Sequence, residues 1–276
     1  MRFYKVWRHE AEKGMPQLGG MLALGIGMAW FFCALCDVEA RGSGMACTHF
    51  MDYWTYVFGG MGVYLPDGKT PFEFPAPFLA AHLLGLFQQG YYWGEDRKYM
   101  EAVRLLGAGG RKRGLAAKWL WNLAAAAGYY LCLYGAMALY CVCRGNVLDF
   151  GGDAALEREL FGVSYIASGC GNALKFMSCV LLAGLALHGL VFLLSFFVGG
   201  AAGMLFSAAC LGASAYWATP WLAGNLAMPL RSTLAEEGPF PVGLGMGAAT
   251  LLLAGTLLAG LFFIRKYNFL DKEERI

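Results

Sequence analysis

The charged side chains best placed to bind a partner gather between Gly94 and Lys118. Acids at the start of this stretch suit a helix N-terminus, Tyr99 and Val103 recur at helical spacing, and the glycine-rich run 107–110 favours a break. We therefore expect a short amphipathic helix that docks a partner. The alternative is a solvated loop without a partner. Its charged residues are Glu95, Asp96, Arg97, Lys98, Glu101 and Arg104.

A second group of polar residues interrupts long apolar runs. His82, Gln88 and Asn122 are candidates for a substrate pathway, and His188 is a further titratable residue in such a run. Polar or ionisable groups inside a membrane are functional candidates by default, although a packed histidine is the favoured explanation of His82. The apolar runs contain no Asp, Glu, Lys or Arg, which argues against an ion-coupled carrier.

Motifs for catalysis are incomplete. Gly68-Lys69-Thr70 ends like a phosphate-binding loop, but the leading glycine of that motif falls on Val63. Ser214 lies in a Gly-Ala-Ser-Ala run that lacks the last glycine of the rhomboid protease motif, and we expect a buried, hydrogen-bonded serine. We expect no catalytic residue, metal site or cofactor in this chain, and no nucleic-acid partner.

The elements that position these residues are expected to be membrane helices. Hydrophobic residues make up 58% of the 276 residues and charged residues 14%, against about 25% charged in soluble domains. A span needs about 20 apolar residues, and the apolar runs do not alternate as barrel strands do. We expect one all-α domain over 1–276, with six spans at 18–36, 78–93, 119–143, 176–198, 201–223 and 241–264.

Basic residues divide unevenly between the segments that join these spans. Segments 1–17, 94–118 and 265–276 hold 15 of the 21 Lys and Arg residues and have a net charge of +7, whereas the opposite segments have −5. The positive-inside rule then predicts that both termini are cytoplasmic. Cys47 and Cys170 both fall in segments predicted to lie outside the membrane, on the side away from the cytoplasm, and the sequence leaves open whether they pair.

The first residues are expected to form a helix in the membrane interface. Phe3, Val6 and Trp7 can share one face at helical spacing, while Arg2 and Lys5 can reach lipid phosphates. A charged leader that only fixes the topology is the alternative.

This layout resembles the permease subunits of type-2 ATP-binding-cassette (ABC) transporters, mostly bacterial exporters. The resemblance covers nearly the whole chain and is one of architecture. The stretches that carry it are the leader Phe3–Gly14, the segment Tyr91–Arg97, the segment Ala223–Gly238 and the basic tail Arg265–Leu270.

The resemblance implies a six-span permease in the bacterial cytoplasmic membrane. The helix within 95–106 would couple to a separate ABC ATPase that binds ATP, and a second permease chain would complete the transporter. The apolar, aromatic spans favour export of a hydrophobic or amphipathic substrate. The alternatives are an intramembrane enzyme, or a non-catalytic assembly subunit that docks a different cytoplasmic partner.

Overall fold

The computed structural model describes residues 3–66, 72–98, 110–162, 170–235 and 238–266. Within these ranges the chain is helical and contains no strand, as predicted; two isolated bridges join His49 to Val147 and Ser232 to Phe240. The long helices are α1 (Phe3–Gly42), α3 (Ala76–Lys98), α5 (Arg111–Cys143), α7 (Cys170–Phe197), α8 (Gly200–Tyr216) and α10 (Val242–Lys266).

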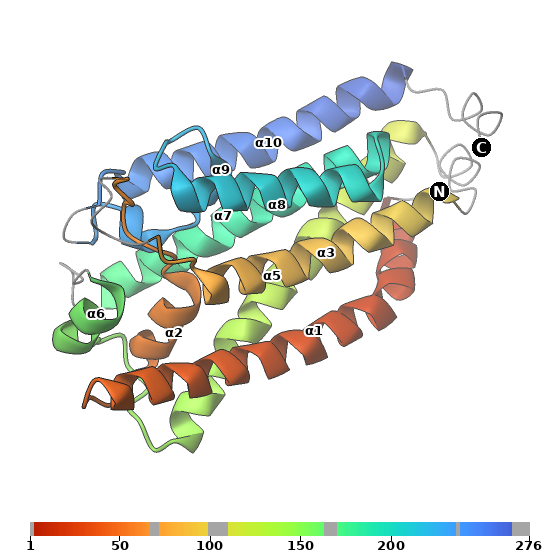
Figure 1. The fold of residues 1–276 in the computed structure, drawn as a ribbon. Helices are drawn as coiled ribbons and strands as arrows, with labels where there is room; N and C mark the ends of the chain where they lie inside the picture. The colour runs from red at the N-terminus through yellow and green to blue at the C-terminus, as the bar shows by residue number, and fades with distance from the viewer. Residues whose placement is uncertain (1–2, 67–71, 99–109, 163–169, 236–237, 267–276) are drawn as a thin grey trace.

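Figure 1 shows these long helices running lengthwise beside one another, and α7 packs against α3, α5, α8 and α10. At one end of the bundle, here the terminal end, α1 begins, α10 ends, and α7 turns into α8. The other end, here the cap end, carries short helices: α2 (Phe50–Phe58), α6 (Ala154–Phe161), α9 (Ala223–Leu226) and the 3₁₀ turn η1 (Pro229–Arg231).

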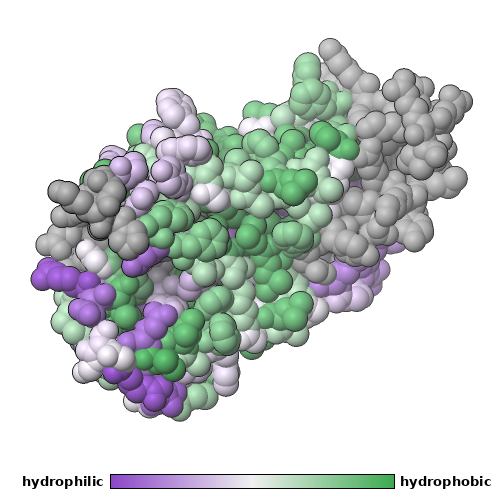
Figure 2. All heavy atoms as spheres, viewed as in Figure 1, coloured by the Kyte–Doolittle hydropathy of each residue, from purple (hydrophilic) through white to green (hydrophobic). Residues whose placement is uncertain are grey.

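Four of the described helices are long and apolar enough to cross a membrane, namely α1, α5, α7 and α10. The other two long helices contribute shorter apolar stretches, Ala76–Phe87 and Gly200–Tyr216. Large apolar side chains such as Leu131, Leu205 and Leu251 are exposed, and Figure 2 shows a hydrophobic band over the middle of one face. These features indicate a membrane-embedded protein; the count of six spans stays a prediction.

The N-terminal leader is continuous with the first long helix, where the sequence predicts a separate interfacial helix. No residue between Phe3 and Gly42 ends the helix, and Pro16 lies inside it. Figure 1 shows the first turns of α1 at an angle to the remainder, and proline is the usual cause of such a bend.

Helix α8 ends earlier than the predicted span. The helix stops at Tyr216, and Trp217 has extended backbone angles, whereas the sequence predicts a span to residue 223. Pro220 explains part of the difference, because proline cannot donate to a helix and restricts the residue before it. The remaining chain from Ala223 to Arg231 folds into α9 and η1.

Candidate functional site

Three fully buried polar rings meet in the middle of the bundle. His82 from α3, Tyr130 from α5 and His188 from α7 are each completely shielded from solvent. The ring centroid of Tyr130 lies 5.6 Å from that of His82 and 5.9 Å from that of His188. We call these three residues the His–Tyr centre. It joins two residues named from sequence, His82 and His188, to Tyr130, which the sequence does not single out.

The polar atoms of the His–Tyr centre are mostly unpaired. The Nδ1 atom of His82 lies 2.9 Å from the carbonyl oxygen of Phe78. His82 Nε2, both ring nitrogens of His188 and the Tyr130 hydroxyl have no hydrogen-bond partner among the described residues. Leaving a buried polar group unpaired costs about 1–3 kcal/mol. This centre is therefore a place where stability alone does not explain the residue types.

Two glycines let the helix backbones approach these rings closely. A Cβ atom on Gly85 would lie 3.2 Å from His188 Nε2 and 2.9 Å from a ring carbon of Tyr129. A Cβ atom on Gly184 would overlap the ring and hydroxyl of Tyr130. Any side chain at these positions would push α3 or α7 away from the centre, so the glycines keep it compact.

A short chain of amides runs from the centre along the bundle. Asn122 Nδ2 donates to the carbonyl oxygen of His188 at 3.1 Å, and Gln89 Nε2 donates to the carbonyl oxygen of Asn122 at 3.2 Å. The structure thus brings the predicted Asn122 next to His188. The side chain of Gln88, also predicted, lies outside the described residues.

The predicted coupling residues are described only in part. Glu95, Asp96, Arg97 and Lys98 form the last turn of α3, and their side chains lie outside the described residues, as do Glu101 and Arg104 entirely. Their docking role stays a prediction.

The predicted interfacial residues have different surroundings from one another. Phe3 is exposed and Val6 is buried. Trp7 packs edge-on against Trp121 of α5, with the ring centroids 6.5 Å apart. Beside them, Lys118 Nζ donates to Glu10 Oε2 at 2.9 Å in a fully buried ion pair. The first turns of α1 are therefore held against α5, and contact of Phe3 with lipid stays a prediction.

A carboxylate network closes the cap end. The buried Asp37 at the end of α1 accepts hydrogen bonds from the hydroxyls of Tyr53 at 2.8 Å and Tyr140 at 2.9 Å. Its Oδ2 atom also lies 3.0 Å from Nε of the half-exposed Arg144. Burial, followed by the hydrogen bond to Asp37, raises the pKa of Tyr53 well above its ordinary value. Tyr53 therefore stays a proton donor.

Arg231 anchors the segment between α8 and α10. Its side chain is fully buried, and burial lowers its pKa to about 10, so the guanidinium stays charged at neutral pH. Each guanidinium nitrogen donates to the protein, mostly to backbone carbonyls. The acceptors are the carbonyl oxygens of Met61, Gly62, Ser214 and Ala215 and the side-chain oxygen of Asn225.

These contacts place a cation at the C-terminal end of α8, where the helix dipole is negative. The hydroxyl of Ser214 donates to the carbonyl oxygen of Cys210 in its own helix, as expected for a structural serine. Sequence reasoning missed Arg231 because nothing local marks a loop arginine as buried.

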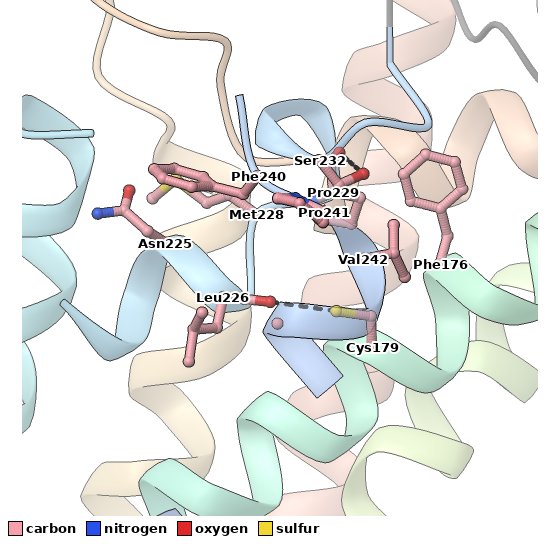
Figure 3. A pocket seen from close by; sticks show the side chains of 11 residues that line it. Phe176, Cys179, Asn225, Leu226, Met228, Pro229, Ser232, Phe240, Pro241 and Val242 are labelled. Atoms are coloured by element: carbon pink, nitrogen blue, oxygen red, sulfur yellow. Dashed lines mark hydrogen bonds between the residues drawn. The ribbon is translucent and has the colours of Figure 1, made fainter. Parts of the chain in front are cut away.

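A small cavity lies beside this segment, between α7 and the start of α10 (Figure 3). Its volume is about 20 Å³, room for about one water molecule. The cavity is lined largely by apolar side chains, and Cys179 Sγ donates to the carbonyl oxygen of Leu226 at 3.3 Å across it. It is too small to hold an organic substrate.

The described part of the chain contains no group of three His, Cys, Asp or Glu residues that could hold a metal ion. Comparison with family models, curated proteins and solved structures found no match.

Proposed function

We propose that this chain is the membrane-spanning permease subunit of an ABC transporter, driven by a separate ATPase. Its six long helices cross the bacterial cytoplasmic membrane, with the terminal end in the cytoplasm and the cap end outside. A second permease chain completes the pathway, and the cargo is hydrophobic or amphipathic.

The observation that carries this proposal is the segment between α8 and α10. Instead of a surface loop, α9 and η1 are two short helical pieces with buried residues, and Arg231 attaches them to the end of α8. Short membrane-dipping helices before the last span are the feature that type-2 ABC permeases share. The excess of Lys and Arg in segments 1–17, 94–118 and 265–276 supports the same orientation.

The His–Tyr centre fits this proposal as a polar contact beside the substrate route. It lies where α3, α5 and α7 meet, and its unpaired atoms are available to a polar group of an amphipathic cargo. In the proposed mechanism, ATP binding shifts the population of permease conformations, and opening of the helices around this centre exposes it.

The test removes the charges of the predicted coupling helix together. The variant carries Glu95→Gln, Asp96→Asn, Arg97→Gln, Lys98→Gln, Glu101→Gln and Arg104→Gln. It is coexpressed with any ABC ATPase that a neighbouring gene encodes, copurified with it and reconstituted in proteoliposomes. ATP-dependent movement of a fluorescent short-chain phospholipid is expected to fall by about tenfold or more, because the coupling free energy is lost.

The matched control is Glu159→Gln with Lys175→Gln, two exposed charges at the cap end. This control should keep the full transport rate and the same yield of folded protein. The proposal is contradicted if the variant with all six substitutions keeps full ATP-driven transport, or if the unaltered protein purifies without any ATPase. In the second case the non-catalytic assembly subunit becomes the better assignment.

A further inference from the structure

Two buried cysteines face each other at the cap end. Cys36 is near the end of α1, and Cys47 follows it by eleven positions; their Sγ atoms are 3.4 Å apart. The exposed fraction is 0% for Cys36 and 5% for Cys47. All nine cysteines lie in the described residues as free thiols, and only this pair has its sulfur atoms within hydrogen-bonding distance of each other.

The backbone between them sets this approach. Helix α1 ends at Gly42, and Gly44 has a positive φ of 75°, which glycine adopts without strain. The amide of Met45 then donates to the carbonyl oxygen of Ala40 at 2.8 Å. This turn reverses the chain and brings Cys47 back alongside the last turns of α1.

A second set of contacts fixes Cys47 from the other side. The amide of Val147 donates to the carbonyl oxygen of Thr48 at 2.9 Å, and the amide of Phe50 donates to the carbonyl oxygen of Val147 at 3.1 Å. Asp52 Oδ2 accepts from the amides of Thr48 and His49. Cys47 is therefore held by hydrogen bonds on the residues after it, independently of its sulfur.

From this juxtaposition we propose that Cys36 and Cys47 are joined by a disulfide bond in the mature protein. A disulfide needs its sulfur atoms about 2.0 Å apart, so these atoms must approach by about 1.4 Å, within the range of side-chain rotation. The bond would attach the end of α1 to the segment that begins α2, beside the Asp37 network. It rests on the proposed orientation, because disulfides persist in oxidising compartments outside the cytoplasm.

The oxidant is an oxidised dithiol protein of the extracytoplasmic space. The Cys47 thiolate attacks its disulfide and forms a mixed disulfide, releasing one thiolate of the oxidant. The Cys36 thiolate then attacks Cys47 Sγ and displaces the second. Two thiols of this chain become one disulfide, and the oxidant becomes a dithiol whose two sulfur atoms take up the two protons by way of solvent.

The experiment uses the full chain in its native membrane. Cells are quenched in acid, the protein is denatured with N-ethylmaleimide and no reductant, and its peptides are analysed by mass spectrometry. A linked peptide pair containing Cys36 and Cys47, two hydrogen atoms lighter than the reduced pair, is expected. Cys36→Ser should abolish the link and make Cys47 reactive, whereas Cys33→Ser, one turn earlier on α1, should keep it.

A parallel label separates this inference from the proposed function. Cys143 is exposed at the cap end, so a membrane-impermeant maleimide on intact cells reports the orientation without involving the pair. If Cys143 is labelled on intact cells and Cys36 and Cys47 react as free thiols, the disulfide is overturned and the permease proposal is left intact. If Cys143 is labelled only after lysis, the proposed orientation is overturned. The disulfide is overturned as well if Cys36 and Cys47 then react as free thiols. A linked pair supports the disulfide in either case.

Discussion

The cap end and the His–Tyr centre treat buried polar groups in opposite ways. At the cap end, Asp37 has three partners and Arg231 uses all of its nitrogen atoms. In the centre, the ring nitrogens of His188 and the hydroxyl of Tyr130 have none among the described residues. Satisfied buried networks fix a structure, while unsatisfied polar groups in a membrane interior mark function. The difference supports a structural role for the cap end and fits the proposed role of the His–Tyr centre in transport.

The largest expected effect tests the stability assignment at Arg231. Arg231→Leu leaves the carbonyls of Ser214 and Ala215 buried without their donor, so the free energy of unfolding should fall by about 3–5 kcal/mol. SDS titration in mixed micelles measures it. The exposed Arg113→Gln should change it by less than about 0.5 kcal/mol. Equal free energies of unfolding for the two variants would show that the contacts of Arg231 do not stabilise the cap end.

A smaller effect is expected at Asp37. Asp37→Asn keeps the shape but weakens the hydrogen bonds from Tyr53 and Tyr140, and should cost about 1–3 kcal/mol. The ion pair with the half-exposed Arg144 adds little. Glu39→Gln is the matched control, since Glu39 is exposed and accepts one hydrogen bond, from Tyr56. The same titration compares them, and a cost confined to Glu39→Gln would contradict the network.

The smallest effect is the most diagnostic, because two adjacent tyrosines differ in one hydrogen bond. The Tyr129 hydroxyl donates to the carbonyl oxygen of Ala81 at 2.8 Å, so Tyr129→Phe should lower the free energy of unfolding by about 1 kcal/mol. Tyr130→Phe removes an unpaired hydroxyl, and its stability should stay equal or rise slightly.

In the transport assay, we expect the two substitutions to have effects in the opposite order. Tyr130→Phe should slow phospholipid movement in proteoliposomes, with Tyr129→Phe much closer to the unaltered rate. A Tyr130→Phe variant that is destabilised and still transports fully would show that the Tyr130 hydroxyl has a structural role, like that of Tyr129.

Much of the helical layout could be predicted from sequence, because an apolar run of about 20 residues is a local signal. The runs at 18–36, 119–143, 176–198 and 241–264 lie within, or within one residue of, the four helices long enough to span. The end of α8 was wrong by seven residues: Pro220 is a local signal, but the buried fold of α9 and η1 is set by distant contacts.

The candidate site was predictable only in pieces. His82, His188 and Asn122 stand out as polar residues in apolar runs, yet their meeting depends on which faces of α3, α5 and α7 pack together. Tyr130 is adjacent to Tyr129 and has the same residue type, so only the packing distinguishes them. Asp37 and Arg231 take partners from several elements, among them Tyr140 and Met61, which are 103 and 170 residues away, and no spacing rule reaches that far.

The Arg231 anchor also constrains how the protein is made. The chain leaves the ribosome from its N-terminus, so α8 emerges before Arg231 does. Every acceptor of the guanidinium lies earlier in the chain, from Met61 to Asn225. The charged side chain therefore emerges after all of its acceptors, and α10 follows it. The order of synthesis therefore shortens the time that the guanidinium spends without acceptors.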